Sequence, residues 1–338
     1  MWIFLILACT DGTGGPEAGG PDEVPPPTGF LDDRTGTGNL YVTDTFLHHI
    51  YPVDILFVID NSCSMAEEQE LLDLNAGPFV DFLELTGSDY HIGVVTTDLD
   101  DPAESGKLQP DQDGALWLDP ATLDPFASFT TIVNQGIEGS GDEQGRGAFY
   151  TALTEPLTTG ANAGFLREEA MLIGVVLSDE LDYTPDDLIS KPDFITWALD
   201  LKDNPAEYLT FNSVVGPPAG CGDLATSGED YIGLTNEIGG VVANICTANF
   251  DGLFDSMAST IPTDSMLLSE APVVETLLVV AIEPGVPPRT LLVDVEWMYD
   301  APTQSIGIIG GLAEGSEVNV TYWPESAVGT STAGYPAP

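Results

Sequence analysis

Positive charge is what this sequence has least of. Its 338 residues include 7 Lys and Arg against 55 Asp and Glu, which gives a formal net charge of −48. Nucleic-acid binding depends on cationic contacts to phosphate, so this class of function is excluded. Anionic lipid headgroups are unsuitable partners for the same reason. Such a surface accumulates cations and needs salt to limit its self-repulsion. Adaptation to saline surroundings and diffuse binding of divalent ions both fit; we favour the first.

Histidine and cysteine are also scarce, with three and four residues respectively. There is no C-x-x-C pair, so we do not expect a zinc site. Cys221 and Cys246 flank a predicted helix at 227–239, and their pairing would join a long loop to the last strand of the sheet, in keeping with an oxidising compartment. Cys63 is left over as a buried thiol, a pairing thiol or a reactive one; we favour burial.

One apolar run stands out in what the sequence does contain. Residues 53–64 read V-D-I-L-F-V-I-D-N-S-C-S. The run has no polar alternation, which predicts a central parallel strand covered by helices on both faces. It ends in Asp60, followed by Ser62 and Ser64. The carboxyl end of such a strand is where open α/β sheets place ligands, and these hard oxygen donors suit Mg²⁺ or a similar cation.

A simpler interpretation of the same residues is helix capping. Ser64 and Glu67 form an S-x-x-E capping box, and acidic residues in a first helical turn complement the helix dipole. Capping needs only one such residue, however, whereas three oxygen donors follow this strand. We therefore favour a metal site.

The D-N-S-C-S segment resembles the D-x-S-x-S signature of von Willebrand factor A domains, whose metal-ion-dependent adhesion site lies above the first strand. The resemblance implies Mg²⁺, or Mn²⁺ or Ca²⁺, bound by Asp60, Ser62 and Ser64. A second apolar run, A-M-L-I-G-V-V-L-S-D, ends at Asp179. In that family an Asp at the end of the fourth strand completes the site, often through water.

A third loop of that family normally supplies a Thr at the start of a helix. This chain has G-S-G-D-E-Q-G there instead, so Ser140 or Asp142 would have to substitute. Three further segments, 91–98, 162–170 and 177–182, resemble A-domain lipoproteins of myxobacteria-like Gram-negative cells. The resemblance covers about residues 46–323.

The first residues indicate a lipid anchor. Residues 1–9 form a short apolar run ending Ala-Cys, too short to span a bilayer. They resemble a truncated bacterial lipoprotein signal that is cleaved before Cys9, which would carry the lipid; a stray apolar start with an ordinary Cys is the alternative. Residues 10–29 are rich in Gly, Pro and acid and suit a tether. Thr10 after the cysteine resembles the outer-membrane class.

The remaining pattern predicts a doubly wound, mainly parallel α/β sheet followed by a small β-rich domain. We expect strands near 53–60, 90–97, 170–178, 207–215 and 241–246, and helices near 64–86, 143–158, 185–202, 228–239 and 249–259. Residues 98–140 should be a long loop with little regular structure. The predicted divisions are a signal (1–8), a tether (9–45), the A-like domain (46–262), a four-stranded β domain (263–324) and a flexible tail (325–338).

Three hypotheses for function follow. The first is a lipid-anchored binding module at the outer membrane or cell surface, or otherwise in the periplasm or secreted, whose cation binds a carboxylate of a protein partner. The second is a structural envelope scaffold that does not depend on metal. The third is enzymatic, because D-N-S and the later S-D-E-L-D faintly resemble haloacid-dehalogenase-like phosphatases. Asn61 stands where their second acid belongs, and the motifs of other enzyme classes are absent, so we expect no enzyme.

Overall fold

A computed structural model describes residues 41–222, 224–247, 250–261, 265–309 and 311–328. The predicted signal, Cys9, most of the tether and residues 329–338 lie outside these ranges. Among the helices inside them, none combines the length and the apolar character that a membrane crossing requires.

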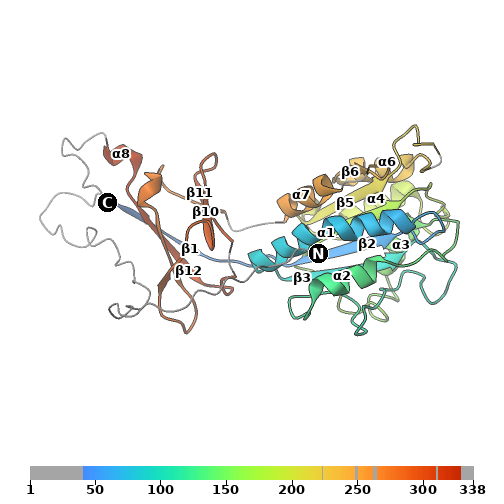
Figure 1. Cartoon of the computed structure of the whole chain (residues 1–338), viewed down its shortest axis with the longest axis horizontal. Coiled ribbons are helices and arrows are strands. Elements are labelled where there is room, and N and C mark those ends of the chain that lie inside the picture. The colour runs from blue at the N-terminus through green and yellow to red at the C-terminus, as the bar shows by residue number, and fades with distance from the viewer. Residues whose placement is uncertain (1–40, 223, 248–249, 262–264, 310, 329–338) are drawn as a thin grey trace, which may run out of the picture. The chain divides into compact units, whose positions relative to one another are not determined.

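The centre of the α/β part is a five-stranded parallel sheet with the order β3-β2-β4-β5-β6 (Figure 1). Its strands are β2 (Val53–Ile59), β3 (Tyr90–Thr96), β4 (Met171–Ser178), β5 (Leu209–Val215) and β6 (Val242–Asn244). Every neighbouring pair runs parallel. This confirms the predicted fold class and the predicted strands. The chain passes from β2 to β3 on one side and then crosses to β4 on the other, so the topological switch point lies at the carboxyl end of β2.

Helices pack on both faces of this sheet. Both sides of strand β2 are therefore buried, which is why its sequence lacks polar alternation. Ile55 and Phe57 belong to one buried cluster, whereas Leu56 and Val58 belong to another. The first cluster includes residues of α1 (Ala66–Thr86), α2 (Pro125–Val133) and α7 (Asp251–Thr260). The second includes residues of α3 (Gly145–Ala152), α4 (Lys191–Asp200) and α6 (Glu229–Ile238). A short α5 (Pro205–Tyr208) precedes β5.

Residues 98–140 are mostly turns and irregular structure, as predicted, but they contain one helix, α2, that the sequence analysis did not anticipate. Asp124 caps this helix by accepting a hydrogen bond from the Ala127 N–H at 3.1 Å, and Pro125 occupies its first turn. Phe129 and Ile132 are fully buried against the sheet. A second difference is that α3 ends at Ala152, well before the expected residue 158.

The β-rich part consists of two antiparallel sheets. One has the order β1-β12-β8-β9 and the other β10-β11-β7. The strands are β1 (Val42–Leu47), β7 (Ser265–Leu267), β8 (Leu278–Ile282), β9 (Arg289–Thr290), β10 (Trp297–Asp300), β11 (Ser305–Ile308) and β12 (Glu317–Tyr322); a 3-10 turn, η1 (Val274–Thr276), and α8 (Glu325–Val328) accompany them. Their shared core includes Trp297, Val318 and Tyr322.

Two features of this part correct the predicted divisions. Strand β1 pairs with β12 from Val42↔Tyr322 to Leu47↔Glu317, so residues 42–45 belong to a sheet and not to a tether. Residues 263–324 were expected to form a four-stranded domain, but the residues described in this range form six strands, β7 to β12, divided between two sheets. The chain therefore leaves the β-rich part after β1, forms the α/β part, and re-enters the β-rich part at β7, in the other antiparallel sheet.

Candidate metal site

Asp60 lies at the switch point, immediately after β2. Its N–H donates to the Leu177 carbonyl at 2.9 Å and so extends the ladder between β2 and β4. Its carboxylate is completely buried. Oδ1 accepts a hydrogen bond from the Ser62 N–H at 2.9 Å, and Oδ2 accepts one from the Ser178 hydroxyl at 2.7 Å. The partners that hold this carboxylate in place are therefore neutral donors.

Ser62 and Ser64 lie between Asp60 and helix α1. Their hydroxyl oxygens are 3.3 Å apart, so the two side chains face each other. Ser62 is buried and Ser64 is exposed. The N-cap residue of α1 is Met65, which makes no side-chain cap hydrogen bond, so the capping-box interpretation of Ser64 was wrong. The Ser64 hydroxyl is therefore directed to Ser62 and not to a cap of α1.

Asp179 follows β4 and brings a second carboxylate to the same edge of the sheet. It is 6% exposed, and its Oδ1 has no hydrogen-bond partner. Burial raises the pKa of Asp179, a hydrogen bond from Ser64 opposes this, and the charge of Asp60 adds to the increase. The structure therefore brings Asp60, Ser64 and Asp179 together at this edge of the sheet.

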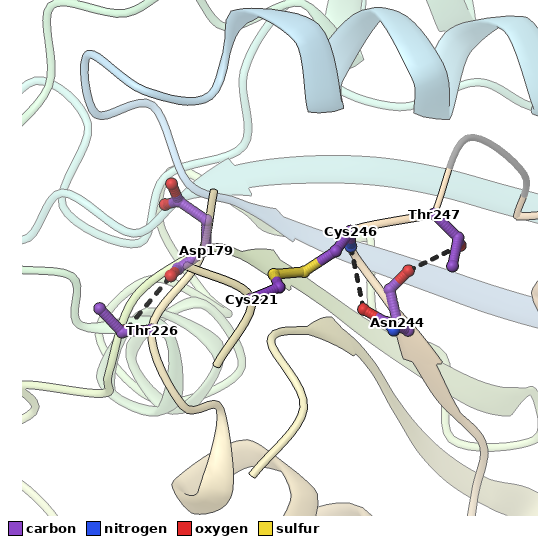
Figure 2. The surroundings of a disulfide bond; sticks show 6 residues. All are labelled: Asp179, Cys221, Thr226, Asn244, Cys246 and Thr247. Carbon is purple, nitrogen blue, oxygen red and sulfur yellow. Dashed lines mark hydrogen bonds between the residues drawn. A yellow bond between two sulfur atoms is a disulfide. The ribbon is translucent and has the colours of Figure 1, made fainter. Parts of the chain in front are cut away.

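A disulfide supports the loop behind Asp179. Cys221 and Cys246 are joined as predicted, with their Cα atoms 6.6 Å apart. The Thr226 N–H, on the same loop as Cys221, donates to the Asp179 carbonyl at 2.8 Å. Figure 2 shows this contact beside the disulfide, with the Asp179 carboxylate pointing away from Thr226. The remaining described cysteine, Cys63, is exposed, so its predicted burial was wrong.

Ser140 and Asp142, the two residues proposed to replace the loop Thr, have other contacts. The Ser140 N–H donates to Asp98 Oδ2 at 3.0 Å, and its hydroxyl donates to Asp100 Oδ2 at 3.2 Å. Asp142 is exposed, and its N–H donates to the Ser140 hydroxyl at 3.1 Å. The contacts of Ser140 therefore tie it to the loop after β3 and not to Asp60.

Glu143 is the residue that this loop presents to Asp60, and sequence reasoning missed it. It is 1% exposed. Its Oε2 accepts a hydrogen bond from the Thr97 hydroxyl, and its Oε1 has no partner. Burial raises the pKa of Glu143 to about 9, with further contributions from the charge of Asp60 and from a side-chain contact with it. The available signal was position, since Glu143 directly precedes the cap of α3.

The loop that carries Glu143 is fixed against the loop that carries Asp60. The Gly139 N–H donates to the Asn61 carbonyl at 2.9 Å. A Cβ at Gly139 would come within 2.2 Å of Asn61 Oδ1, so this approach requires glycine. The Gln69 side chain donates to both the Asp60 and the Gly136 carbonyls at 2.9 Å. These bonds hold the two loops together without any contribution from a cation.

The electrostatic surroundings of the site are strongly negative. Burial is the main cause that raises the pKa values of Glu68 and Glu180, and the charges of both Asp60 and Asp179 raise them further. The nearest basic residue of α3, Arg146, is engaged elsewhere: its Nε lies 3.2 Å from Asp182 Oδ2. In the part of the chain that the structure describes, the buried carboxyl groups gathered here are thus not paired with Lys or Arg.

This donor set fits a hard divalent cation. All of the donors are oxygens, and Asp179 Oδ1 and Glu143 Oε1 are buried without partners. Within the described ranges, no three His, Cys, Asp or Glu side chains are arranged to hold a metal ion by themselves. A cation here would therefore need the hydroxyls of Ser62 and Ser64, or water, as additional ligands.

Comparisons with known proteins give distant likenesses in fold. No family model and no curated protein matches the chain. Among solved structures, a von Willebrand factor type A protein from Catenulispora acidiphila is similar over 84% of this chain and 65% of its own, with 12% identity and a TM-score of 0.35. The pilus adhesin SpaC from Lactobacillus rhamnosus GG, in an open conformation, is similar over 83% of this chain and 40% of its own, with 11% identity and a TM-score of 0.41.

A third similar structure is proximal thread matrix protein 1 from the mussel byssus, over 67% of this chain and 51% of its own, with 12% identity and a TM-score of 0.40. The chain thus spans less than two thirds of the length of each of these proteins. At such scores the likeness carries no argument about function, which has to come from the site itself.

Proposed function

We propose that this chain is a binding module that depends on a divalent cation. Mg²⁺, or Mn²⁺ or Ca²⁺ in its place, is held by Asp60, Ser62, Ser64 and Asp179, directly or through water. The observation that carries the proposal is the buried carboxylate pair of Asp60 and Asp179, which has neutral donors but no Lys or Arg of the described residues paired with it.

The energetic argument concerns the cost of buried charge. A carboxylate that leaves water loses several kcal/mol of solvation, so buried carboxylates are normally paired with a cation or protonated. Asp60 and Asp179 repel each other, and the charge of Asp60 helps to raise the pKa of Asp179. A divalent cation removes this repulsion and satisfies the unpartnered Asp179 Oδ1.

The partner we propose is a protein that presents a carboxylate. When bound, the cation supplies positive charge on an otherwise negative surface, so an acidic side chain can approach it. The residues of this chain orient the cation at the sheet edge: Ser178 and the Ser62 N–H fix the Asp60 carboxylate, and the loop joined to the disulfide fixes the Asp179 backbone. We propose no enzymatic activity.

The second candidate function is an envelope scaffold that does not depend on metal. Glu143 is the observation that favours it, because a carboxyl group whose pKa is raised to about 9 retains its proton at neutral pH. That proton can relieve the repulsion from Asp60 in part, without a cation. The two candidates therefore differ in whether the site takes up a cation or only a proton.

The same proposal places the module at the outer membrane or cell surface, held by a lipid on Cys9; otherwise it is periplasmic or secreted. Mass spectrometry of the N-terminal peptide from cell envelopes tests the anchor. A lipid mass on Cys9 supports it, and an unmodified Cys9 in a mature protein contradicts it.

Calorimetric titration of the metal-stripped protein with Mg²⁺, Mn²⁺ and Ca²⁺ tests the cation site. We expect one saturable site that is lost in an Asp60→Ala/Ser62→Ala variant. An Asp100→Ala/Ser140→Ala variant is the matched control, because it removes the same two residue types from a contacting pair at the same edge. Equal and weak heats in all three proteins would leave the metal-independent scaffold as the function.

A further inference from the structure

Hydrogen bonds hold both the backbone and the side chain of Glu143 in place. The N–H of its neighbour Gln144 donates to the Thr97 carbonyl at 3.2 Å, and the Tyr183 N–H donates to the Glu143 carbonyl at 2.6 Å. The Thr97 hydroxyl fixes one carboxylate oxygen. Backbone and side chain are thus anchored to the loops after β3 and β4, and little conformational entropy remains to be lost when Glu143 binds a ligand.

The other oxygen of Glu143 is free and buried, and the carboxylate that it approaches is Asp60. The two side chains are in contact, and their interaction is repulsive when both are ionised. Two carboxylates in contact at a buried site require either a shared proton or a cation between them. Glu143 Oε1, buried without a hydrogen-bond partner, is therefore placed to bind whatever cation Asp60 binds.

The net charge of this site differs from that of a site in which a hydroxyl takes the place of Glu143. With Asp60 and Asp179 alone, a divalent cation would be neutralised, and a partner's carboxylate would add one negative charge. With Glu143 as a third acid beside the serine hydroxyls, and with water completing the contacts that the carboxylates do not make themselves, the loaded site is already negative before any partner arrives. Glu68 and Glu180 add to this potential, because the same charges act on them. A further carboxylate is then repelled unless it replaces one that is present.

We propose that Glu143 is an internal ligand of the cation that competes with the partner's carboxylate, so that the loaded module is closed until a partner displaces Glu143. This inference rests on the proposed function, since it requires a cation at the site. It predicts two opposite effects: Glu143 strengthens the binding of the cation and weakens the binding of a partner's carboxylate.

Two substitutions of Glu143 test these two effects. Glu143→Thr supplies the hydroxyl that an open site would use, and Glu143→Gln keeps the shape of the side chain while removing its charge. Glu138→Gln is the matched control, because Glu138 is an exposed acid of the same loop. Near-ultraviolet circular dichroism of each variant checks that the fold is retained.

Mn²⁺ is the probe, because water-proton relaxation reports how many water molecules remain on the bound ion. We expect both Glu143 variants to bind Mn²⁺ at least about tenfold more weakly than the natural protein, since even indirect support of a metal ligand is worth about that factor. We also expect more bound water in the variants. Acetate, added as a carboxylate probe, should displace water in Glu143→Thr but not in the natural protein or in Glu138→Gln.

The possible failures can be told apart. Equal Mn²⁺ affinity, equal bound water and an equal response to acetate in all four proteins would overturn the role of Glu143 and leave the cation site standing. The absence of a saturable Mn²⁺ site in the natural protein and in both Glu143 variants would overturn the proposed function as well. A Mn²⁺ site that appears only in the variants would show that Glu143 blocks the cation and does not bind it.

Discussion

Strand β2 and its end carry two fully buried aspartates, Asp54 near its start and Asp60 just after its last residue. The protein treats them differently. Asp54 Oδ1 lies 2.8 Å from Arg167 Nε, and its Oδ2 accepts a hydrogen bond from the Arg167 N–H at 2.6 Å. Asp60 has no such pair, and its hydrogen bonds come from a serine hydroxyl and a backbone N–H. Among the described residues, one buried aspartate has a basic partner and the other has none.

The difference is informative because basic residues are so few. The chain has 7 Lys and Arg, and two of those that the structure describes lie at the Asp54 end. Arg167 pairs with Asp54 and also with Asp89, and Lys202 donates to the Arg167 carbonyl at 2.6 Å. Burial is the main cause that raises the pKa of Asp54, and Arg167 counteracts it. Among the described residues, Arg167 thus pairs with one buried aspartate, while the aspartate at the switch point, where external ligands bind, has no such partner.

The largest effect should come from replacing Arg167, the basic residue that pairs with Asp54. Arg167→Met leaves Asp54 buried without its counter-charge, so the free energy of unfolding should fall by about 3–5 kcal/mol. Urea denaturation measures this change. Added Mg²⁺ should not restore the loss, because the defect lies at the opposite end of β2.

Arg289→Met is the control for losing a basic residue in general. Arg289 is about half exposed and pairs with Glu283 and Glu296, so its removal should cost no more than about 1 kcal/mol. Equal losses in the two variants would contradict the contrast drawn between a buried pair and a surface pair.

The second effect concerns the divalent cation that we propose to bind at Asp60. Mg²⁺ at about 100 times its dissociation constant should raise the free energy of unfolding by about 2.7 kcal/mol. Asp60→Asn should abolish this gain, whereas Asp54→Asn should retain it on a less stable protein. Thermal unfolding with and without Mg²⁺ measures both variants. NaCl at equal ionic strength is needed beside it, because screening alone stabilises a chain of this charge. A gain from Mg²⁺ that survives Asp60→Asn would place the cation elsewhere.

The third effect is a pH dependence of the metal-free protein. The folded pKa of Glu143, about 9, exceeds the ordinary Glu value of 4.5, so the protonated form is favoured in the folded state. Its contribution to stability is complete below pH 4.5 and is lost as the pH rises through 9. The slope for one proton is at most about 1.4 kcal/mol per pH unit.

Glu143→Gln should flatten this slope between pH 5 and pH 8, which denaturation at a series of pH values measures. Saturating Mg²⁺ should flatten it in the natural protein, since the cation replaces the proton. An unchanged slope in Glu143→Gln would mean that another group carries the pH dependence.

The contrast between predicted and unpredicted residues has a physical cause. Asp60 and Asp179 could be predicted because each follows an apolar strand, and parallel strands bring their carboxyl ends to one edge. Glu143 could not, because G-S-G-D-E-Q-G has no periodicity and the direction of its side chain depends on Thr97 and Tyr183, which are distant in sequence.

Strand β1 illustrates a second cause of error. Residues 42–47 alternate in burial, but they follow a Gly- and Pro-rich stretch and pair with β12, about 275 residues later. A single sequence does not show such a pairing. Cys63 was misjudged because free cysteines are usually buried, whereas this one lies in the exposed turn between β2 and α1.

The smallest expected effect is a difference in Mg²⁺ affinity between a Ser178 variant and a matched variant of Ser213 on the neighbouring strand. Ser178→Ala removes the hydroxyl that donates to Asp60 Oδ2, and Ser213→Ala removes a buried hydroxyl that is bonded to Thr235. Each should lower the free energy of unfolding by about 1 kcal/mol, because each loses one buried hydrogen bond. Only Ser178→Ala should also weaken Mg²⁺ binding, by a few-fold in calorimetry, since Asp60 then loses the contact that orients it. Equal Mg²⁺ affinity in both variants would mean that the Asp60 carboxylate needs no such support, and that β2 and its own loop suffice to place it.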